Sequence, residues 1–379
     1  MRSILEFGAK NDGSADLSAV FAEAFAAGER EILIPAGEYR LDHTLRIPSN
    51  AKIVAEDGAH IFANPGNYTD AAMIENENQL IGDENITVTG GLWDGRCDLN
   101  DRDSYCDIVK IGLMFNFVKA TNLVLENLRV INGVSYHFRL GECRHFRVEN
   151  IRIEGTIIPL CQDGIHMGGG CEYGLIKNIW VVDGGLGDDL IALNADDAFW
   201  FGQNIGMKPL PIRHIRVENV DACNCYTVIR LLSLDTEISD VHMKNIRGGY
   251  RAHGINMDAG HLSGGKFYFH PSKHFCKAGA IRDVTFEDIS LWCTAPVEKR
   301  PGRPCIAFEE NVKNMRFVNL SHPRENETQT VPMFRFNQIS ETDFTVDGVT
   351  RHIAHGETYE HDQDHYGEIL INSDTELLK

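Results

Sequence analysis

The sequence has 379 residues, of which 43% are hydrophobic and 24% charged, a composition typical of a globular protein rather than a disordered, collagenous or coiled-coil chain. Its 36 basic and 55 acidic residues give a formal net charge of −19, which excludes a sequence-independent nucleic-acid binder. No apolar run reaches the roughly 18 residues that a membrane span needs. We therefore expect neither nucleic acid nor membrane as a partner.

The N-terminal segment predicts a helix and a strand. Residues 14–28 read as one amphipathic helix that ends at Gly28, and residues 31–35 read as a short strand. The first residues contain no apolar secretory leader, which predicts a cytoplasmic protein.

A short phrase then recurs along the chain: an apolar residue, any residue, Asn or Asp, an apolar residue, any residue and another apolar residue. It is clearest around Asn127, Asn150 and Asn178, and an earlier version lies near residues 88–90. Looser copies surround five later residues: Asn219, Asn245, Asp288, Asn319 and Asp347. Apolar and polar positions alternate within the copies, which indicates strands rather than helices.

This repeat predicts a solenoid. The copies from Asn127 onward are 23, 28, 41, 26, 43, 31 and 28 residues apart, and one copy alone cannot bury its apolar row. The central Asn suits a left-handed turn and can bond to the Asn of the neighbouring rung. We predict an all-β fold, a single-stranded parallel β-helix with an N-terminal helix cap. Insertions at about 197–211 and 259–279 should form loops on its functional face.

The whole chain is expected to form one domain. Its parts are an N-terminal cap, the solenoid rungs and a C-terminal cap or tail: 1–40, 41–350 and 351–379.

Three carboxylates occupy corresponding places in successive rungs. Asp163 follows Gln162, and 25 residues after Asp163 come Asp188 and Asp189, preceded by Gly187. Because rungs stack about 4.8 Å apart, we expect the three side chains to cluster, with a bend at Gly187 turning both neighbours outward. Neighbouring carboxylates raise one another's pKa. An acid beside a base is what glycoside hydrolysis requires.

At these residues the sequence resembles the polygalacturonase-type glycoside hydrolases, family 28 of the pectin-lyase-like superfamily. The matching segments are residues 7–13, 34–39, 91–95, 162–166 and 187–193. The resemblance covers most of residues 3–350 and implies a right-handed parallel β-helix and hydrolysis with inversion. It also implies that Asp188 is the general acid and that Asp163 and Asp189 activate the water.

Two motifs of that family differ in this chain. Residues 224–230, which include Tyr226, stand where the family has Gly-His-Gly, and Asn256-Met257-Asp258 stand where it has Arg-Ile-Lys. A carboxylate at Asp258 would repel a uronate at the place where the family's cations would bind it. This difference argues against galacturonan as the substrate, without deciding the question.

Two residues are expected to compensate for these differences. Arg230 can supply a replacement charge from the neighbouring rung, and His166, facing outward, can replace the missing histidine. We count Tyr226, Asn256 and Asp258 among the substrate-binding positions with them.

The loops supply further candidates. Trp200 follows the acidic rung and is expected to bind sugar, while the basic residues of 259–279 and of 299–304 are interpreted as solvated loops. His137 and His145 are interpreted as structural. The ten cysteines contain no CxxC pair and are interpreted as free, buried thiols, and no set has zinc-site spacing, so we predict neither a metal nor another cofactor.

The leading hypothesis is an inverting glycoside hydrolase that acts from the chain end on a plant- or microbe-derived oligosaccharide. One alternative is a polysaccharide lyase or epimerase on the same fold, which would need a cation to neutralise a substrate carboxylate. The other is a non-catalytic carbohydrate-binding β-helix. A binding surface gains nothing from mutually repelling carboxylates, which argues against this last hypothesis.

Overall fold

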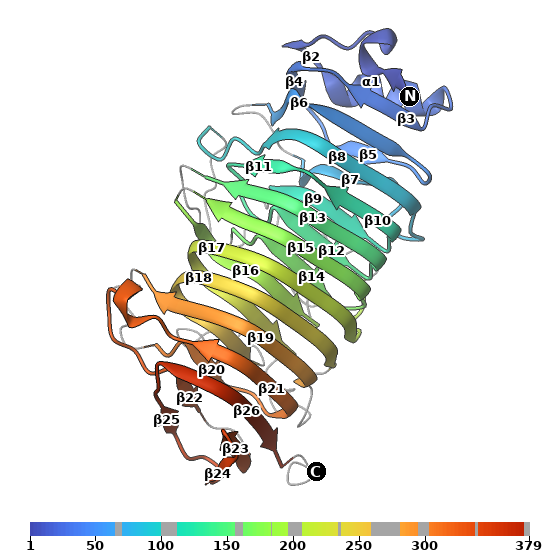
Figure 1. Ribbon diagram of the computed structural model, residues 1–379. Coiled ribbons are helices and arrows are strands. Elements are labelled where there is room, and N and C mark those ends of the chain that lie inside the picture. The colour runs from blue at the N-terminus through green and yellow to red at the C-terminus, as the bar shows by residue number, and fades with distance from the viewer. Residues whose placement is uncertain are drawn as a thin grey trace.

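The chain forms a column of stacked strands with a helix across its N-terminal end (Figure 1). The computed structural model describes residues 1–64, 70–99, 112–155, 162–182, 184–195, 207–233, 236–258, 281–294, 303–337 and 340–374. All 26 strands belong to one hydrogen-bonded system, and pairing is parallel until the C-terminal end. The fold is the predicted right-handed parallel β-helix.

Each turn of the solenoid contributes strands to three faces. Two faces are built by strands that bend or break midway: β6 (Lys52–Ala63), β8 (Glu84–Asp94), β10 (Thr121–Glu126), β11 (Arg129–Ile131), β13 (Arg144–Glu154), β15 (Glu172–Val182), β19 (Ile281–Cys293) and β21 (Val312–Ser321). The third face, here called the site face, consists of β5 (Leu45–Ile47), β7 (Ala72–Asn76), β9 (Leu113–Val118), β12 (Phe138–Gly141), β14 (Ile165–Gly168), β16 (Leu186–Asn194), β20 (Ile306–Phe308) and β22 (Phe334–Phe336). The long strands β17 (Ile212–Leu232) and β18 (Ile238–Asp258) run across all three faces.

The N-terminal cap is built from β1 (Arg2–Ser3), a 3-10 helix (Ile4–Phe7), β2 (Asp12–Asp16), α1 (Leu17–Ala26), β3 (Glu31–Ile34) and β4 (Gly37–Leu41). The predicted helix at 14–28 is therefore shorter, because residues up to Asp16 pair as a strand with β4 and Asp16 caps α1 through Ser18 N. The rings of Phe21 and Phe25 in α1 lie 5.5 Å apart, tilted by 47°, and help to close the core at this end.

The repeated Asn residues form a ladder at the bend between two faces. Seven of them have left-handed backbone with φ between +54° and +59°: Asn127, Asn150, Asn178, Asn219, Asn245, Asp288 and Asn319. Within the ladder, Asn178 Nδ2 donates to Asn150 Oδ1 at 2.8 Å, and Asn219 Nδ2 donates to Asn178 Oδ1 at 2.9 Å. The predicted turn and the predicted inter-rung bond are both present.

The core is a continuous apolar column inside the three faces. Residues at one register repeat from rung to rung, as Val148, Ile176 and Val217 do, and each is fully buried. Near the N-terminal end, the rings of Phe115 and Phe138 stack at 4.9 Å, and Trp93 meets Phe115 at 5.3 Å. The rungs thus bury together the apolar rows that none could bury alone.

The C-terminal end changes from parallel to antiparallel pairing. It comprises a 3-10 helix (Arg324–Asn326), β23 (Thr342–Val346), β24 (Val349–Ile353), β25 (Tyr359–His361) and β26 (His365–Ser373). Strand β26 runs antiparallel to β21, and β23 runs antiparallel to β24. The predicted repeat copy at Asp347 is wrong, because this residue lies in the hairpin turn between β23 and β24 rather than in the Asn ladder.

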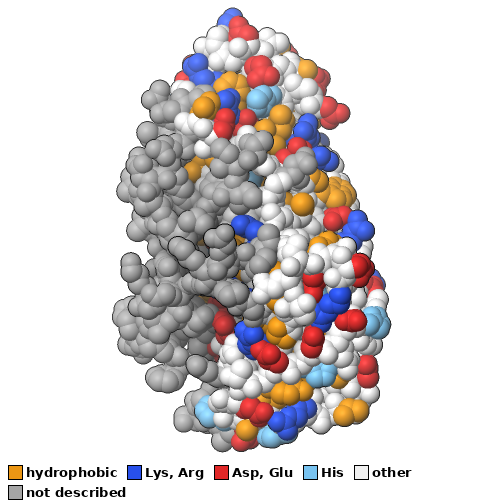
Figure 2. Space-filling model, turned by 90° about the vertical axis from the view of Figure 1, so that its left-hand side faces the viewer, with side chains coloured by type: hydrophobic (Ala, Val, Ile, Leu, Met, Phe, Trp, Pro, Cys, Tyr) orange, Lys and Arg blue, Asp and Glu red, His pale blue; other side chains and the backbone are white. Residues whose placement is uncertain are grey.

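Acidic and basic side chains are mixed over the visible surface, without a patch of a single sign (Figure 2). Among the described residues, no helix combines the length and apolarity that crossing a membrane requires.

Candidate active site

Three aspartates meet on the site face. Asp163 lies just before β14, and Asp188 and Asp189 lie in β16 of the next rung. Their carboxylate oxygens lie within 4.8 Å of one another. Asp163 and Asp189 are each only 3% exposed, whereas Asp188 is half-buried. The predicted clustering is therefore observed, and Asp188 is the most accessible of the three to a ligand.

A bulge explains how neighbouring residues both join this cluster. Leu186 pairs with Cys225 and Asp189 pairs with Thr227, so β16 contains one residue more than β17 over this stretch. The bulge includes Gly187, where the sequence predicts a bend. The turn just before it has left-handed backbone at Gly185, where a Cβ atom would lie 2.2 Å from the Asn224 carbonyl oxygen.

Asp163 is held by histidines on two sides. Its Oδ2 lies 2.6 Å from Nδ1 of His166, and the His166 ring stacks on Tyr136 at 4.6 Å. Its backbone oxygen lies 2.9 Å from Nδ1 of His137, and burial lowers the pKa of His137 to about 4. His166 therefore faces the site as predicted but is 4% exposed, so it positions Asp163 more than it presents itself to a ligand.

Burial raises the pKa of Asp189 to about 7. Arg230 opposes this shift, the charge of Asp163 adds to it, and a hydrogen bond from Thr227 opposes it again. The sequence predicts a raised pKa from mutual repulsion, and repulsion does contribute. Removal of the carboxylate from water is nevertheless the larger cause.

Arg230 and the buried Asp258 form an ion pair beside the cluster, with the Arg230 side chain 33% exposed. Arg230 Nη2 and Nε lie 3.0 Å and 3.1 Å from Asp258 Oδ2, and Arg230 Nη1 lies 3.5 Å from Asp189 Oδ2. Asn256 Nδ2 donates to the same Asp258 oxygen at 2.8 Å. This corrects two expectations. Asp258 is no free carboxylate that would repel a uronate, and Arg230 is no spare cation, because each already compensates the other.

Tyr226 lies close to two arginines. Arg303 Nη1 donates to its hydroxyl at 3.2 Å, and the Cζ atoms of Arg303 and Arg251 lie 5.9 Å and 6.0 Å from its ring centroid. The expectation that the basic run 299–304 is only solvated is wrong for Arg303, the first of its described residues. Sequence reasoning missed Arg251 altogether, because it lies outside both family motifs.

The histidine missing from residues 224–230 has a counterpart one rung later. Thr227 pairs with Asp189 on one side and with His253 on the other. His253 is 7% exposed, its Nδ1 lies 3.0 Å from the Pro304 carbonyl oxygen, and burial lowers its pKa to about 4. The sequence offered a signal, since His253 and Gly254 stand directly before an inward Ile255, but in the wrong rung for the family pattern.

Several predicted features lie outside the described residues. These are Trp200, the loop 259–279 and the loop 197–211 apart from its last residues. Of the described part, Met207 is buried, and its sulfur lies 3.4 Å from Nη2 of Arg139, one rung before His166.

The aspartate cluster is also the group that could hold a cation. Among the described residues it is the one set of three or more His, Cys, Asp or Glu ligand atoms within such a distance. The seven described cysteines are free thiols and five of them are buried: Cys143, Cys171, Cys225, Cys293 and Cys305. The absence of a metal or other cofactor stays a prediction.

Comparisons with known proteins agree with this architecture. A polygalacturonase of Gossypium barbadense is 25% identical over 341 residues, covering 84% of this chain and 75% of the relative. The exopolygalacturonase of Thermotoga maritima superposes with a TM-score of 0.52 over 97% of this chain and 95% of its own, at 14% identity. The surface adhesin PfbA of Streptococcus pneumoniae superposes with a TM-score of 0.57 over 93% of this chain and 99% of its own, at 13% identity.

At such low identity the two solved structures establish the fold alone. The family assignment comes from a different comparison. The family model described as "Rhamnogalacturonase A/epimerase, pectate lyase-like" matches residues 1–251, about two thirds of the 379 residues. The chain therefore belongs to the rhamnogalacturonase A/epimerase family of pectate lyase-like proteins.

Proposed function

We propose that this protein is a glycoside hydrolase that cleaves an oligosaccharide with inversion, using Asp188 as general acid and Asp163 and Asp189 to activate water. One observation carries the proposal: three carboxylates gather within 4.8 Å on one face, two of them buried and one half-exposed. Hydrolysis of a glycosidic bond needs a proton donor for the leaving oxygen and a base for the water.

The spacing suits a shared water. A water that donates hydrogen bonds of about 2.8 Å to two acceptors holds them roughly 4.6 Å apart. The oxygens of Asp163 and Asp189 lie within a distance of this kind. Asp188 is the more exposed group and is therefore better able to reach a glycosidic oxygen that arrives from solvent.

Inversion is the part of the proposal that rests on the resemblance alone. Inverting enzymes usually separate their two carboxyl groups by about 6.5–9.5 Å, and retaining enzymes by about 5–5.5 Å. The 4.8 Å limit here is shorter than both ranges. The spacing therefore does not itself argue for inversion, and the stereochemistry of the product decides it.

The test is product analysis with wild type and Asp188→Asn on neutral and uronic-acid oligosaccharides. Mass spectrometry should find fragments that together gain one water, and Asp188→Asn should lower the rate by about 10²–10⁴-fold. A matched control is Asp240→Asn, an exposed carboxylate paired with Arg216 on another face, which should leave the rate unchanged. Equal losses in both variants would contradict the role of Asp188.

Proton NMR of the first product supplies the stereochemistry. The opposite anomer of the substrate configuration supports inversion, and the same anomer overturns it. We also propose exo action, for which early products should be single terminal units rather than a mixture of lengths.

The remaining outcomes separate the alternatives. An unsaturated ring in the product would identify a lyase, and a changed sugar at unchanged mass would identify an epimerase. Selective binding without any product would favour a carbohydrate-binding β-helix. The likeness to an adhesin is at the level of the fold and is compatible with this alternative.

A further inference from the structure

Two guanidinium groups flank Tyr226 beside the aspartate cluster. Arg251 comes from β18, and Arg303 comes from the segment just before β20. Each lies about 6 Å from the ring centroid, and Arg303 also donates to the hydroxyl. Two cations at one phenol ring gather positive charge in a chain whose net charge is −19.

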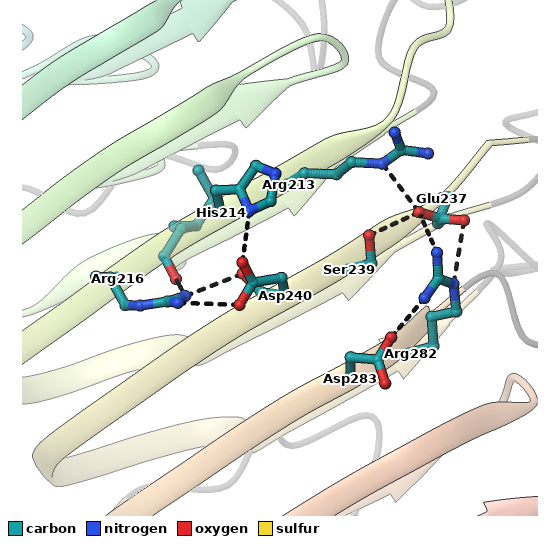
Figure 3. A network of polar contacts seen from close by, with 9 residues as sticks. Arg213, His214, Arg216, Glu237, Ser239, Asp240, Arg282 and Asp283 are labelled. Atoms are coloured by element: carbon teal, nitrogen blue, oxygen red, sulfur yellow. Dashed lines mark hydrogen bonds and ion pairs between the residues drawn. The ribbon is translucent and has the colours of Figure 1, made fainter.

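Within the described part of the chain, neither cation has a carboxylate in direct contact. Among the described residues, no carboxylate oxygen lies within 4.0 Å of Arg251 or Arg303. Surface arginines of the neighbouring strands β17 and β19 are paired, as Arg213 and Arg282 are with Glu237 (Figure 3). Arg230, which is one third exposed, has two carboxylates.

Arg251 also has unused hydrogen-bonding capacity. Its Nη2 donates to the backbone oxygen of Leu186, but its buried Nε has no hydrogen-bond partner among the described residues. Burial lowers the pKa of this guanidinium, which means that its charge is held at a cost in free energy. A partly buried cation with no carboxylate in direct contact is destabilising unless a ligand supplies one.

The position of this pair is close to the reacting groups. Leu186, which accepts from Arg251, starts the bulge that carries Asp188, and Asp188 attracts the Arg251 charge. Tyr226 directly precedes Thr227, which pairs with Asp189. Tyr226 therefore lies on the rung directly after Asp189, and Arg251 and Arg303 lie on the next two rungs.

We propose that Arg251, Arg303 and the Tyr226 hydroxyl form a subsite for an anionic substituent, a carboxylate or a sulfate ester, on the sugar next to the bond that is cleaved. This inference rests on the proposed function and deepens it. The guanidinium fork donates parallel hydrogen bonds that match either oxyanion. Recognition would thus come from β18 five residues before Asn256 and not from the Asn256 and Asp258 positions, which the ion pair with Arg230 occupies.

Ligand-observed NMR titrations of the full chain test the subsite without any cleavage. The probes are galacturonic acid, galactose 4-sulfate and neutral galactose, none of which contains a glycosidic bond. Wild type should bind an anionic sugar more tightly than galactose, and added salt should weaken that preference. Arg251→Met and Arg303→Met should each weaken anion binding by about tenfold to a hundredfold and leave galactose binding unchanged.

Two further variants guard against a merely structural effect. Arg251→Lys keeps the charge and should retain part of the anion preference. Arg247→Met removes an exposed arginine of the same strand, paired with Asp221, and should change nothing. A preference for galacturonic acid or for the sulfate would identify the substituent.

Three results would overturn the subsite: no anion preference in wild type, equal losses for galactose in Arg251→Met, or loss of the preference in Arg247→Met. Cleavage assays on the same preparations keep the two proposals apart. A chain that prefers anions but cleaves nothing would contradict the hydrolase and leave the subsite standing. A chain that cleaves only neutral oligosaccharides would contradict the subsite and leave the hydrolase standing.

Discussion

The network of charged residues drawn in Figure 3, here called the edge, differs from the site face in how its charged side chains are paired and exposed. At the edge, Glu237 binds Arg213 and Arg282, and Asp240 binds Arg216, between neighbouring strands at 2.9–3.1 Å, with all five side chains partly exposed. On the site face, Asp163 and Asp189 are buried, and Arg230 is shared between two carboxylates.

The two regions differ in how much their charged residues affect stability. Exposed pairs contribute about 0–1 kcal/mol each, so the edge can be altered with little consequence. Buried charges cost several kcal/mol each unless they are compensated. The buried charges of the site face lower stability unless they are compensated, so they point to a function that needs them.

The largest expected effect on stability comes from removing Arg230, the cation that compensates the buried Asp258. Arg230→Met should lower the free energy of unfolding by about 3–5 kcal/mol, because it leaves Asp258 uncompensated beside Asp189. Arg247→Met at an exposed pair should lower it by only about 0–1 kcal/mol. Urea unfolding followed by circular dichroism measures both.

The double variant Arg230→Met/Asp258→Leu is the matched control, since it removes both charges and should regain most of the lost stability. If Arg230→Met and Arg247→Met cost the same, the contrast between the two regions fails.

The second prediction concerns pH. A carboxyl pKa raised to about 7 in the folded chain and near 3.9 in the unfolded chain means that the folded state binds more protons between these values. The contribution of Asp189 to stability should therefore be greatest below about pH 4 and should fall by a few kcal/mol as pH rises to about 7. Asp189→Asn should remove this dependence, measured as the difference in unfolding free energy across pH.

The same titration assigns the catalytic role. If Asp189 helps to activate water, it must be ionised, and kcat/KM should rise with pH through about 7. A rate that instead falls through about pH 7 would make Asp189 the proton donor and would exchange the roles proposed for Asp188 and Asp189.

The smallest effect is expected in the Asn ladder. Asn178→Ala should cost about 1–2 kcal/mol, because it removes two exposed hydrogen bonds and places alanine at a φ of +56°. Asn178→Gly loses the same bonds but tolerates this backbone, so it should cost less. Thermal unfolding distinguishes them, and an equal cost would mean that the side-chain bonds alone matter.

The ladder and the aspartate trio could both be predicted from the sequence, for one physical reason. Each rung needs a residue that tolerates left-handed backbone at the bend, so Asn recurs at 127, 150 and 178. The same repeat places Asp163 one rung from Asp189. The sequence around Asp347 matches the repeat, but its strands pair antiparallel with each other instead of with a neighbouring rung of the ladder.

The surroundings of the trio were not predictable in this way. Arg251 and Arg303 are 52 residues apart and both lie close to Tyr226, with the insertion at about 259–279 between them in the sequence. The bulge after Leu186 shifts the register by one residue, which no spacing rule anticipates. The ion pair between Asp258 and Arg230 was not predictable either, because it depends on how the two side chains are buried in the folded chain.

The two caps have a consequence for association between molecules. A stack of parallel strands offers unpaired backbone groups at both ends, where another chain could add and extend the stack into a fibre. At one end α1 covers the core, and the outermost strand β1 has only two residues. At the other end the reversal of direction in β26 and β23 leaves no parallel register for a further rung to continue. The caps thus act as terminators that keep a repeating architecture finite.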